Sequence, residues 1–542
     1  LNERNQPQWL QRHLEHHISV VLGWLWWDEG KWKIVDWLME HSDVVIRFNG
    51  GHNAGHTVSV NWKKFDLHIL PSWSVREWKI NIITSGCVLG LDLPKVDLGK
   101  MIYASESGEL VFNATMDDLR KRYTEKDQQE GKGIKGEPVR AGLIPELEQL
   151  IRKGVNVQKE PVKISAQTPL IGVHHVLLDA LEEEKRKSQW LEKIWSTGSG
   201  IAPAYASKRE DNCFSLETLL NSPDTYYDAV RTLWGKNAHH FPNISAEELV
   251  SLAREDYQRL QDLISQGKIE VIQDERSYIN DLKSKWKRIV AEWAQGALIG
   301  ANYSPFGTSS SPDLPTFCDA TGINIWDIGN LFAVFKMPPS SVGTRPQMLA
   351  YIEDEILNQL RAKYNERGVT SGRDRQIFGY SLPEFAKAMA LMIANSGFSM
   401  DRVVPVFNGV DRIPDFARLE KGWIPRVITG WKYRHGISDI LVGLRRPGMS
   451  ITPEEALYNY PDRDLMGSPA VFASGRGDLH FRKIQGKLNG DETPKWVSEA
   501  TRELIGMILA SMFMGSKFPE AIFWFGPDRH QSSTYSHIDM VR

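Results

Sequence analysis

Buried strands and an amphipathic helix alternate near the start of the chain. Residues 18–23 form a continuous run of apolar and β-branched side chains that ends in a glycine, as in a strand buried on both faces. Residues 33–40 carry apolar side chains at helical spacing, and residues 44–48 repeat the pattern of a buried strand. This strand–helix–strand order is typical of a parallel α/β sheet.

Two apolar runs near the carboxyl end extend the same pattern. Residues 403–407 and 521–525 are strongly apolar, and a polar or glycine-containing turn follows each run. In open α/β sheets, the loops after the carboxyl ends of the strands build the ligand site. We therefore predict an α/β protein: one large domain at residues 18–542 around a mostly parallel central sheet, preceded by an extension at residues 1–17.

Two segments differ in character from this domain. Residues 103–160 contain a charged, glycine-punctuated stretch at 121–133 that is nearly free of apolar side chains, which indicates an exposed insertion. Residues 215–288 are charged and rich in helical patterns, and residues 177–193 predict an amphipathic helix with a solvated charged face. We expect insertions at about 103–160 and 215–288.

The composition is that of an enzyme-sized globular protein. Of 542 residues, 41% are hydrophobic, and 65 lysines and arginines nearly balance 68 aspartates and glutamates. This balance argues against a nucleic-acid or anionic-membrane surface. Cys87, Cys213 and Cys318 are too widely spaced to favour a disulfide framework or a structural zinc site. Because no apolar signal core or long apolar run occurs, we expect a cytoplasmic protein.

The strongest candidate for chemistry is a glycine-rich loop at residues 50–57. It reads Gly-Gly-His-Asn-Ala-Gly-His-Thr, and glycines at this density let backbone N–H groups converge on an anion. His56 could act as a general acid or donate to a phosphate oxygen. The alternative is a glycine-rich hairpin with exposed histidines.

A second candidate, Asp28-Glu29-Gly30-Lys31, lies where the first predicted strand meets the first predicted helix. Unpaired N–H groups and the helix dipole favour phosphate at such a turn. Lys31 could bind the phosphate, and Asp28 could act as a base or hold Mg²⁺. It is not a Walker A loop, because Trp32 stands where that motif requires Ser or Thr. The alternative is a charged helix start.

Two hydroxyl-rich stretches could bind anionic groups. Residues 196–200, Ser-Thr-Gly-Ser-Gly, could grip a monophosphate, and they could equally cap a helix. Residues 370–375, Thr-Ser-Gly-Arg-Asp-Arg, pair hydroxyl groups with two arginines that could clamp a carboxylate or phosphate, unless the arginines are simply exposed.

Three more stretches could meet a nucleotide. Gln295 and the hydroxyl-rich loop that begins at Thr308 could contact a base edge and a phosphate, although serine-rich loops are usually only loops. Asp411 could accept two hydrogen bonds from guanine, with an ordinary turn aspartate as the alternative. Gly526-Pro527 could flank the same base.

The order of these stretches resembles that of the adenylosuccinate synthetase family. The series runs from Asp-Glu-Gly-Lys through Gly-Gly-His-Asn-Ala-Gly-His-Thr, Thr-Gly-x-Gly-Ile-x-Pro-Ala-Tyr, Ala-Gln-Gly, Thr-Ser-Ser and Thr-x-Gly-Arg to Gly-Pro-Asp-Arg. The matching segments lie between about residues 18 and 529. The resemblance implies a fold like that of P-loop NTPases, and GTP-dependent ligation of L-aspartate to IMP, with Mg²⁺, in a homodimer.

The resemblance also implies a role for each candidate residue. Asp28 would remove the N1 proton of IMP, His56 would act as the acid while O6 attacks the γ-phosphate, and aspartate would then displace the phosphoryl group from C6. The implied ligand contacts are Glu29, Gly30, Lys31, Arg375, Asp411, Gly526 and Pro527 for GTP; Asn53, Ser196, Thr197, Gln295 and Thr308 for IMP; Thr370, Ser371 and Arg373 for aspartate; and Asp28 with the Gly55 carbonyl for Mg²⁺.

The chain departs from the family motif at several of its 19 tryptophans. Trp27 and Trp32 replace two glycines of the motif Gly-Asp-Glu-Gly-Lys-Gly-Lys, and an indole there would compete for the volume of a phosphate. Four more tryptophans stand where glycine is expected: Trp62, Trp73, Trp195 and Trp293. Two hypotheses follow: an active ligase, with a phage-type relative acting on dGMP as a sub-case, or a non-catalytic descendant that uses the fold for binding or assembly.

Overall fold

The computed structural model describes most of the chain. The described residues are 8–26, 29–53, 55–60, 63–94, 101–104, 109–120, 140–188, 198–210, 213–300, 308–342, 355–367, 374–393, 396–416, 427–433, 436–438, 469–473, 487–488, 491–492, 504–506, 508–509, 512–513, 520–524 and 532–536.

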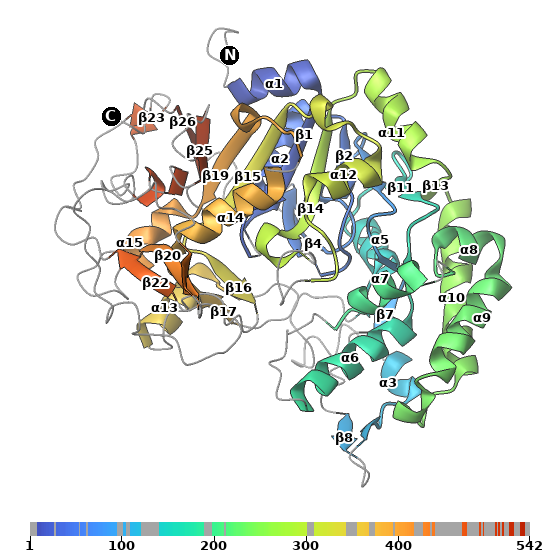
Figure 1. Ribbon diagram of the computed structural model, residues 1–542. Helices are drawn as coiled ribbons and strands as arrows, with labels where there is room; N and C mark the ends of the chain where they lie inside the picture. The colour runs from blue at the N-terminus through green and yellow to red at the C-terminus, as the bar shows by residue number, and fades with distance from the viewer. Residues whose placement is uncertain are drawn as a thin grey trace.

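A ten-stranded sheet runs through the molecule (Figure 1). Its order is β13 (Ile269–Ile272), β11 (Val162–Ser165), β5 (Ile80–Ile83), β2 (Val44–Arg47), β14 (Ile289–Gly296), β1 (Ile18–Gly23), β15 (Asn330–Lys336), β19 (Val403–Asn408), β25 (Glu520–Trp524) and β26 (Ser532–Ser536). Neighbouring strands are parallel from β13 to β25, and only the last pair, β25 with β26, is antiparallel. The predicted mostly parallel α/β fold is confirmed.

The chain reverses its direction across the sheet once. From β1 it proceeds through β2, β5 and β11 to the edge strand β13, and it then returns to β14, between β2 and β1. From there it continues on the other side through β15, β19 and β25. The ends of β14, β1 and β15 therefore lie at a topological switch point, the place where open α/β sheets bind ligands.

β1 is buried on both faces, which explains its continuous apolar sequence. Val20 pairs in register with Ala291 of β14 and Leu331 of β15. The side chains of Val20 and Leu22 pack in the core on one face of the sheet, and Val21 packs in the core on the other. This alternation is the pleat of a central parallel strand.

Helices cover both faces of the sheet. The helices are α1 (Gln8–His16), α2 (Lys31–Leu38), α3 (Met116–Arg120), α5 (Leu143–Arg152), α6 (Val173–Ser188), α7 (Ile201–Glu210), α8 (Leu216–Asn221), α9 (Pro223–Gly235), α10 (Ala246–Ser265), α11 (Glu275–Ser284), α12 (Leu314–Thr321), α13 (Glu355–Tyr364), α14 (Leu382–Ile393) and α15 (Ile413–Phe416). Figure 1 shows α12 and α14 beside strands of the sheet, and both helices contribute to the core that contains Val20, whereas α2 contributes to the core that contains Val21.

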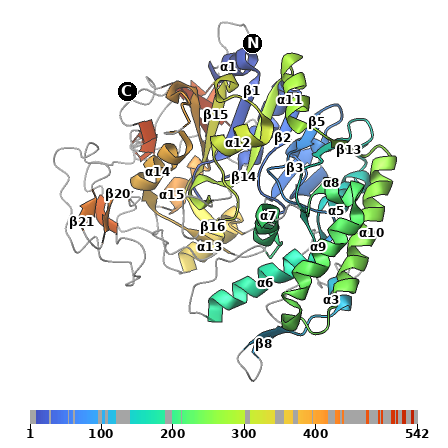
Figure 2. The same cartoon turned by 45° about the vertical axis from the view of Figure 1, so that its right-hand side comes forward.

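A second body of helices adjoins the β13 side of the sheet. Figure 2 shows α6, α8, α9 and α10 gathered there, with α3 and β8 (Ile102–Ala104) at its far end. The charged residues 121–133 lie outside the described residues. Residues 143–152, within the segment expected to be an exposed insertion, instead form α5, which buries Leu143, Leu147 and Leu150. None of the helices in the described part of the chain is long and apolar enough to cross a membrane.

Candidate active site

The described candidate stretches follow the carboxyl ends of neighbouring parallel strands. Residues 29–31 follow β1, the glycine-rich loop follows β2, Gln295 ends β14, and Asp411 follows β19. Parallel strands place their carboxyl ends at one edge of the sheet, so these stretches meet there although they are far apart in sequence.

An ion pair occupies the turn between β1 and α2. Lys31 Nζ lies 2.7 Å from Glu29 Oε2, and both side chains are buried. They pack over Gly23: a Cβ atom at this glycine would lie 2.5 Å from Glu29 Oε2 and 2.6 Å from Lys31 Nζ. A larger residue at position 23 would therefore displace the pair.

The turn has the features of an anion site. Gly30, at φ 80°, precedes α2, whose first turn leaves backbone N–H groups without helical partners. Glu29 Oε1, in contrast, is buried and has no hydrogen-bond partner within the part of the chain that the structure describes, and as a carboxylate oxygen it would accept from a donor or a cation and would repel an anion. Trp27 and Asp28 lie outside the described residues, and Trp32 is half-buried.

Asn408 joins the end of β19 to this turn. Its Nδ2 donates to the Glu29 carbonyl oxygen at 2.5 Å and lies 3.4 Å from the Gly30 carbonyl oxygen. Asp411 follows within a single 3₁₀ turn, and its Oδ1 is buried without a hydrogen-bond partner among the described atoms. The turn and Asp411 are thus held near each other, and both offer acceptors to a ligand. Gly526 and Pro527, just after β25, lie outside the described residues.

The glycine-rich loop after β2 is anchored through its backbone. Arg47, fully buried, donates to the Gly51 carbonyl oxygen at 2.9 Å and also to the His68 carbonyl oxygen. Gly50 has φ 74°, and a Cβ atom there would lie 2.4 Å from the Ala294 Cβ. Asn53, a predicted ligand, turns its Oδ1 onto the Gly51 N–H at 2.9 Å. These hydrogen bonds and the close approach to Ala294 therefore hold the loop in a defined conformation.

The two histidines of this loop have different positions. His52 is 1% exposed and accepts a hydrogen bond from the Gly90 N–H through Nε2, at 2.7 Å. The alternative of a hairpin with exposed histidines is therefore wrong for His52. His56 is the first residue of β3 (His56–Val60), which pairs with β4 (Lys63–Leu67), so the predicted loop ends at Gly55. Nothing is described of the His56 side chain.

The structure brings Gln295 and Thr308 together. Thr308 Oγ1 lies 2.6 Å from Gln295 Oε1 and 2.9 Å from the Ile299 carbonyl oxygen. The Gln295 amide nitrogen donates to the Ser310 carbonyl oxygen at 2.8 Å, and the whole side chain is buried. These bonds fix the amide in one orientation. The neighbouring Ala294 N–H donates to Asn49 Oδ1 at 3.1 Å, and Asn49 directly precedes the glycine-rich loop.

The serine- and glycine-rich stretch at 196–200 leads into α7. Gly200 N–H donates to Asp179 Oδ2 of α6 at 3.0 Å. One turn further, the Tyr205 hydroxyl accepts from the Gly50 N–H at 3.0 Å and donates to the Gly86 carbonyl oxygen at 2.7 Å. This helix therefore connects the stretch to the glycine-rich loop. Ser196 and Thr197 themselves lie outside the described residues.

Arg375 belongs to a buried ion cluster centred on Glu366. Arg375 Nη1 lies 3.1 Å from Glu366 Oε2, Arg412 Nη1 lies 2.6 Å from Oε1, and Lys336 also pairs with Oε2. Burial alone would raise the pKa of Glu366, but the three cations lower that pKa to about 2. Arg412, a member of this cluster, directly follows Asp411 in the chain, so the cluster lies beside Asp411. Thr370, Ser371 and Arg373 lie outside the described residues.

Several residues of the site were not predicted from the sequence. Arg47, Tyr205, Asn408 and Glu366 shape the site through bonds to residues outside their own elements. The sequence offered one usable signal: Arg47, Lys336 and Asn408 are polar residues at the ends of apolar strands.

Comparison with known proteins identifies the family. The adenylosuccinate synthetase family model matches residues 20–100 and 131–395. The adenylosuccinate synthetase of Halothermothrix orenii is 30% identical over 374 residues, which cover 67% of this chain and 72% of that protein. That of Clostridium novyi is 31% identical over 360 residues, which cover 66% of this chain and 71% of the relative.

A solved structure has the same fold. The fully ligated adenylosuccinate synthetase from Plasmodium falciparum aligns with a TM-score of 0.61 and 20% identity, over 95% of this chain and 98% of that chain. The family match continues through residues 215–288 and leaves out residues 101–130. This chain belongs to the adenylosuccinate synthetase family of carbon–nitrogen ligases.

Proposed function

We propose that this chain uses GTP to join L-aspartate to C6 of IMP, giving adenylosuccinate, GDP and phosphate through a 6-phosphoryl intermediate. The observation that carries the proposal is the bond from Asn408 to the Glu29 carbonyl. It holds the turn before α2 close to Asp411, so that one ligand could place its phosphates at the turn and its base at the carboxylate.

The proposed chemistry needs one base and one acid. Asp28 would take the N1 proton of IMP, so that O6 becomes nucleophilic enough to attack the γ-phosphate. His56 would donate to the phosphate oxygens, on which negative charge develops during transfer. The amino group of aspartate would then attack C6, and the phosphoryl group would leave with O6 as inorganic phosphate.

The IMP site is proposed at the glycine-rich loop. Asn53, Gln295 and Thr308 would contact the nucleotide, while Ser196 and Thr197 would hold its phosphate. The fixed orientation of the Gln295 amide supports this assignment, because a preorganised polar group loses little entropy when it meets a ligand.

The GTP site is proposed between the turn before α2 and the ends of β19 and β25. Glu29, Gly30 and Lys31 would meet the phosphates, and Asp411 would read the guanine. The list of proposed GTP contacts is completed by Arg375, Gly526 and Pro527. Asp411 Oδ1, which has no partner among the described residues, supports the base assignment, since a buried acceptor costs free energy until a donor meets it.

The aspartate substrate is proposed to bind at Thr370, Ser371 and Arg373, where an arginine fork can clamp a carboxylate. The proposal further includes a homodimer, by likeness to the family, and a cytoplasmic location, from the composition. Both can be tested separately from the reaction.

Mg²⁺ fits the donor set proposed for it. Asp28 would offer a carboxylate oxygen and Gly55 a backbone carbonyl oxygen, and hard oxygen ligands of this kind suit Mg²⁺. When bound, the ion would neutralise charge on the GTP phosphates. Gly55 lies at the end of the anchored loop, just before β3, which supports a fixed position for its carbonyl.

The test is phosphate release from the purified full-length chain. We expect release to require IMP, L-aspartate and GTP together, and Asp28→Asn to abolish it. Asp117→Asn, a change of the same kind on exposed α3, is the matched control and should leave the rate unchanged. Equal rates in Asp28→Asn and the parent chain would refute the mechanism.

A second candidate function is binding or assembly through the fold, without GTP binding or turnover. This candidate is supported by the buried ion pair between Lys31 and Glu29. The Lys31 ammonium group, which a bound phosphate would need, is already paired with the Glu29 carboxylate. Calorimetry with GTP and Mg²⁺ separates the candidates. A ligase must bind both, whereas a descendant that uses the fold only for assembly gives no heat with GTP while remaining folded.

A further inference from the structure

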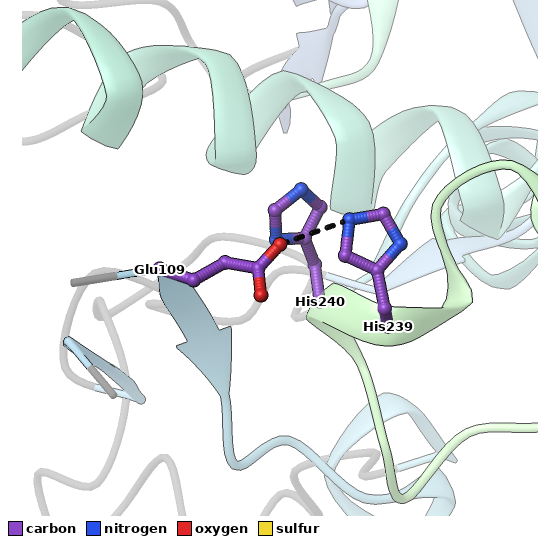
Figure 3. Close-up of side chains that lie close together, drawn as sticks. All are labelled: Glu109, His239 and His240. Carbon is purple, nitrogen blue, oxygen red and sulfur yellow. Dashed lines mark ion pairs between the residues drawn. The ribbon is translucent and has the colours of Figure 1, made fainter. Parts of the chain in front are cut away.

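Three potential metal ligands meet far from the candidate active site. Glu109, His239 and His240 each offer one ligand atom, and these atoms all lie within 4.8 Å of one another (Figure 3). Glu109 Oε1 and His239 Nε2 are 3.3 Å apart. The two histidines are consecutive in the 3₁₀ turn η5 (Ala238–His240), and Glu109 precedes β9 (Leu110–Phe112).

His240 is oriented as metal-binding histidines usually are. Its Nδ1 lies 2.7 Å from the Leu110 carbonyl oxygen, and a carbonyl can only accept, so Nδ1 carries the proton. Nε2 is then the basic nitrogen of the ring. A backbone carbonyl that fixes the tautomer in this way also raises the ligand strength of the other nitrogen.

The cluster joins two parts of the chain with different relations to the family. Residues 101–130, which contain Glu109, fall outside the family match, whereas His239 and His240 lie inside it. The hairpin of β8 with β9 is already packed on η5: the rings of Phe112 and Phe241 stack with centroids 4.5 Å apart. A metal bound here would fasten the chain-specific hairpin to the shared fold.

The ligand atoms of the cluster favour one class of metal ion. Two imidazoles and a carboxylate suit Zn²⁺, whereas Mg²⁺ and Ca²⁺ prefer oxygen ligands alone. Tetrahedral Zn²⁺ with bonds of about 2.0–2.2 Å places neighbouring ligand atoms roughly 3.3–3.6 Å apart. The separation of Glu109 Oε1 from His239 Nε2 matches this edge, and both side chains are exposed enough to rotate toward His240.

We propose that Glu109, His239 and His240 bind one Zn²⁺-class ion that fastens the β8–β9 hairpin to η5. Water fills the fourth position. The site is distinct from the Mg²⁺ site proposed for GTP, and the role of the ion is structural.

The test uses the full-length chain stripped of metal with a chelator and titrated with Zn²⁺ in a calorimeter. We expect one site per chain that His240→Ala, and separately Glu109→Gln, weaken by more than about tenfold. His41→Ala, which removes a histidine outside the cluster, should leave the site unchanged. Titration with Co²⁺ should give the visible absorption of a tetrahedral complex, and the His239→Ala chain should lack it.

Two results would overturn the proposal. One is Zn²⁺ binding that is equally tight in the parent chain and in the double variant His239→Ala with His240→Ala. The other is no Zn²⁺ binding at all by the parent chain. Circular dichroism of each variant shows that a loss of binding is not a loss of fold, and Glu109→Gln tests the site without changing a packed side chain.

A separate observation concerns tryptophans with left-handed backbone. Helix α11 ends in two backbone bonds, Trp286 N–H to the Lys283 carbonyl and Lys287 N–H to the Leu282 carbonyl, at 2.9 and 3.1 Å. This is the Schellman motif, in which the left-handed residue is usually glycine. Trp286 holds that position with φ 56° and is 70% exposed.

Equivalent helix ends in this molecule use smaller residues at the same position. The same pair of bonds closes α5 at Gly154, α10 at Gly267 and α13 at Asn365. Trp78, which lies in a turn, also has left-handed backbone: its φ is 69°, and its side chain is 68% exposed. Both tryptophans therefore stand in backbone that favours glycine and gain little burial in return.

A buried tryptophan adds a third observation. Trp293 is 1% exposed, and its indole N–H has no hydrogen-bond partner among the described residues. An unsatisfied buried donor costs about 1–3 kcal/mol. This residue stands where the family motif has glycine.

We infer that the native host of this gene inserts glycine at positions 78, 286 and 293. Peptide mass spectrometry of the chain isolated from that host should show glycine at all three positions. Tryptophan at any of the three positions in that protein would overturn the inference.

Discussion

The Nδ2 group of Asn408 donates a hydrogen bond of 2.5 Å to the carbonyl oxygen of Glu29, across 379 residues of sequence. It is a bond between two elements of the proposed GTP site. One is the turn that would hold phosphate, and the other is the strand end that carries Asp411 toward the base.

Replacing Asn408 by alanine should therefore weaken GTP binding. Loss of the donor leaves the Glu29 carbonyl unpaired, at a cost of about 1–3 kcal/mol, so we expect the dissociation constant for GTP to rise by about tenfold. Calorimetry measures it. Asn221→Ala, at an exposed helix end, is the control. An unchanged dissociation constant in Asn408→Ala would show that the bond does not support the site.

The threonine that orients Gln295 should affect IMP instead. Thr308→Val removes the hydroxyl that donates to Gln295 Oε1 and leaves a buried acceptor unpaired. We expect the KM for IMP to rise about tenfold while the KM for GTP changes little. Thr316→Val, in α12, is the matched control. A change confined to GTP would contradict the assignment of Gln295 to the IMP pocket.

Glu366 should make the fold sensitive to acid. Three cations hold its pKa at about 2 against the effect of burial, below the ordinary 4.5 of the unfolded chain. A carboxyl with a lowered folded pKa contributes stability above pH 4.5 and loses it as the pH falls toward 2.

Unfolding by urea at several pH values tests this contribution. The parent chain should lose about 3 kcal/mol more than Glu366→Gln between pH 5 and pH 2. Glu355→Gln, an exposed glutamate on α13, should behave as the parent. Identical pH profiles for Glu366→Gln and the parent chain would mean that the cluster is not ionised as described.

Glu146 should have the opposite effect. It is fully buried on α5 and accepts from the N–H groups of Ile69 and Leu70. Burial raises its pKa to about 7, although these donors oppose the rise. A raised folded pKa means that stability is highest below pH 4.5 and falls as the pH rises through 7.

The variant Glu146→Gln should remove that fall. Its amide keeps an oxygen that can accept from the same N–H groups but cannot ionise, so its stability should stay level between pH 5 and pH 8. Glu148→Gln, on the more exposed side of α5, is the control. A parent chain whose unfolding free energy does not fall over this range would refute the raised pKa.

Trp286→Gly should stabilise the protein. Glycine adopts φ 56° without strain, and the Schellman bonds at the end of α11 remain, so we expect a gain of about 1 kcal/mol in the free energy of unfolding. Trp326→Gly, which removes an equally exposed indole from backbone with negative φ, should give no gain. Thermal melts of both variants measure the difference.

The strands could be predicted because each buried strand is a continuous local run of apolar residues. The runs that became β1, β2, β19 and β25 are apolar throughout, and each was found within about two residues. Helix α5 was missed because the charged stretch before it dominated the segment, although Leu143, Leu147 and Leu150 have helical spacing.

The site was predictable only where chemistry is concentrated in one stretch. The glycine-rich loop could be recognised by composition, and the resemblance assigned Gln295 and Thr308 to one pocket, whereas the hydrogen bond between them is seen only in the structure. Arg47 and Asn408 left no such signal, because each acts through a bond whose partner is decided by the order of strands in the sheet. The strand order depends on the whole chain, so no local sequence pattern predicts it.

The reversal of the chain across the sheet has a consequence for folding during synthesis. β1 is made before both of its neighbours in the sheet, β14 and β15, which begin at Ile289 and Asn330. Both edges of this apolar strand therefore stay unpaired until Ile289 and the residues after it have been made, and unpaired strand edges are the condition under which strands associate wrongly. We expect high contact order to make folding slow, and the proposed GTP site to form only after β19 has docked.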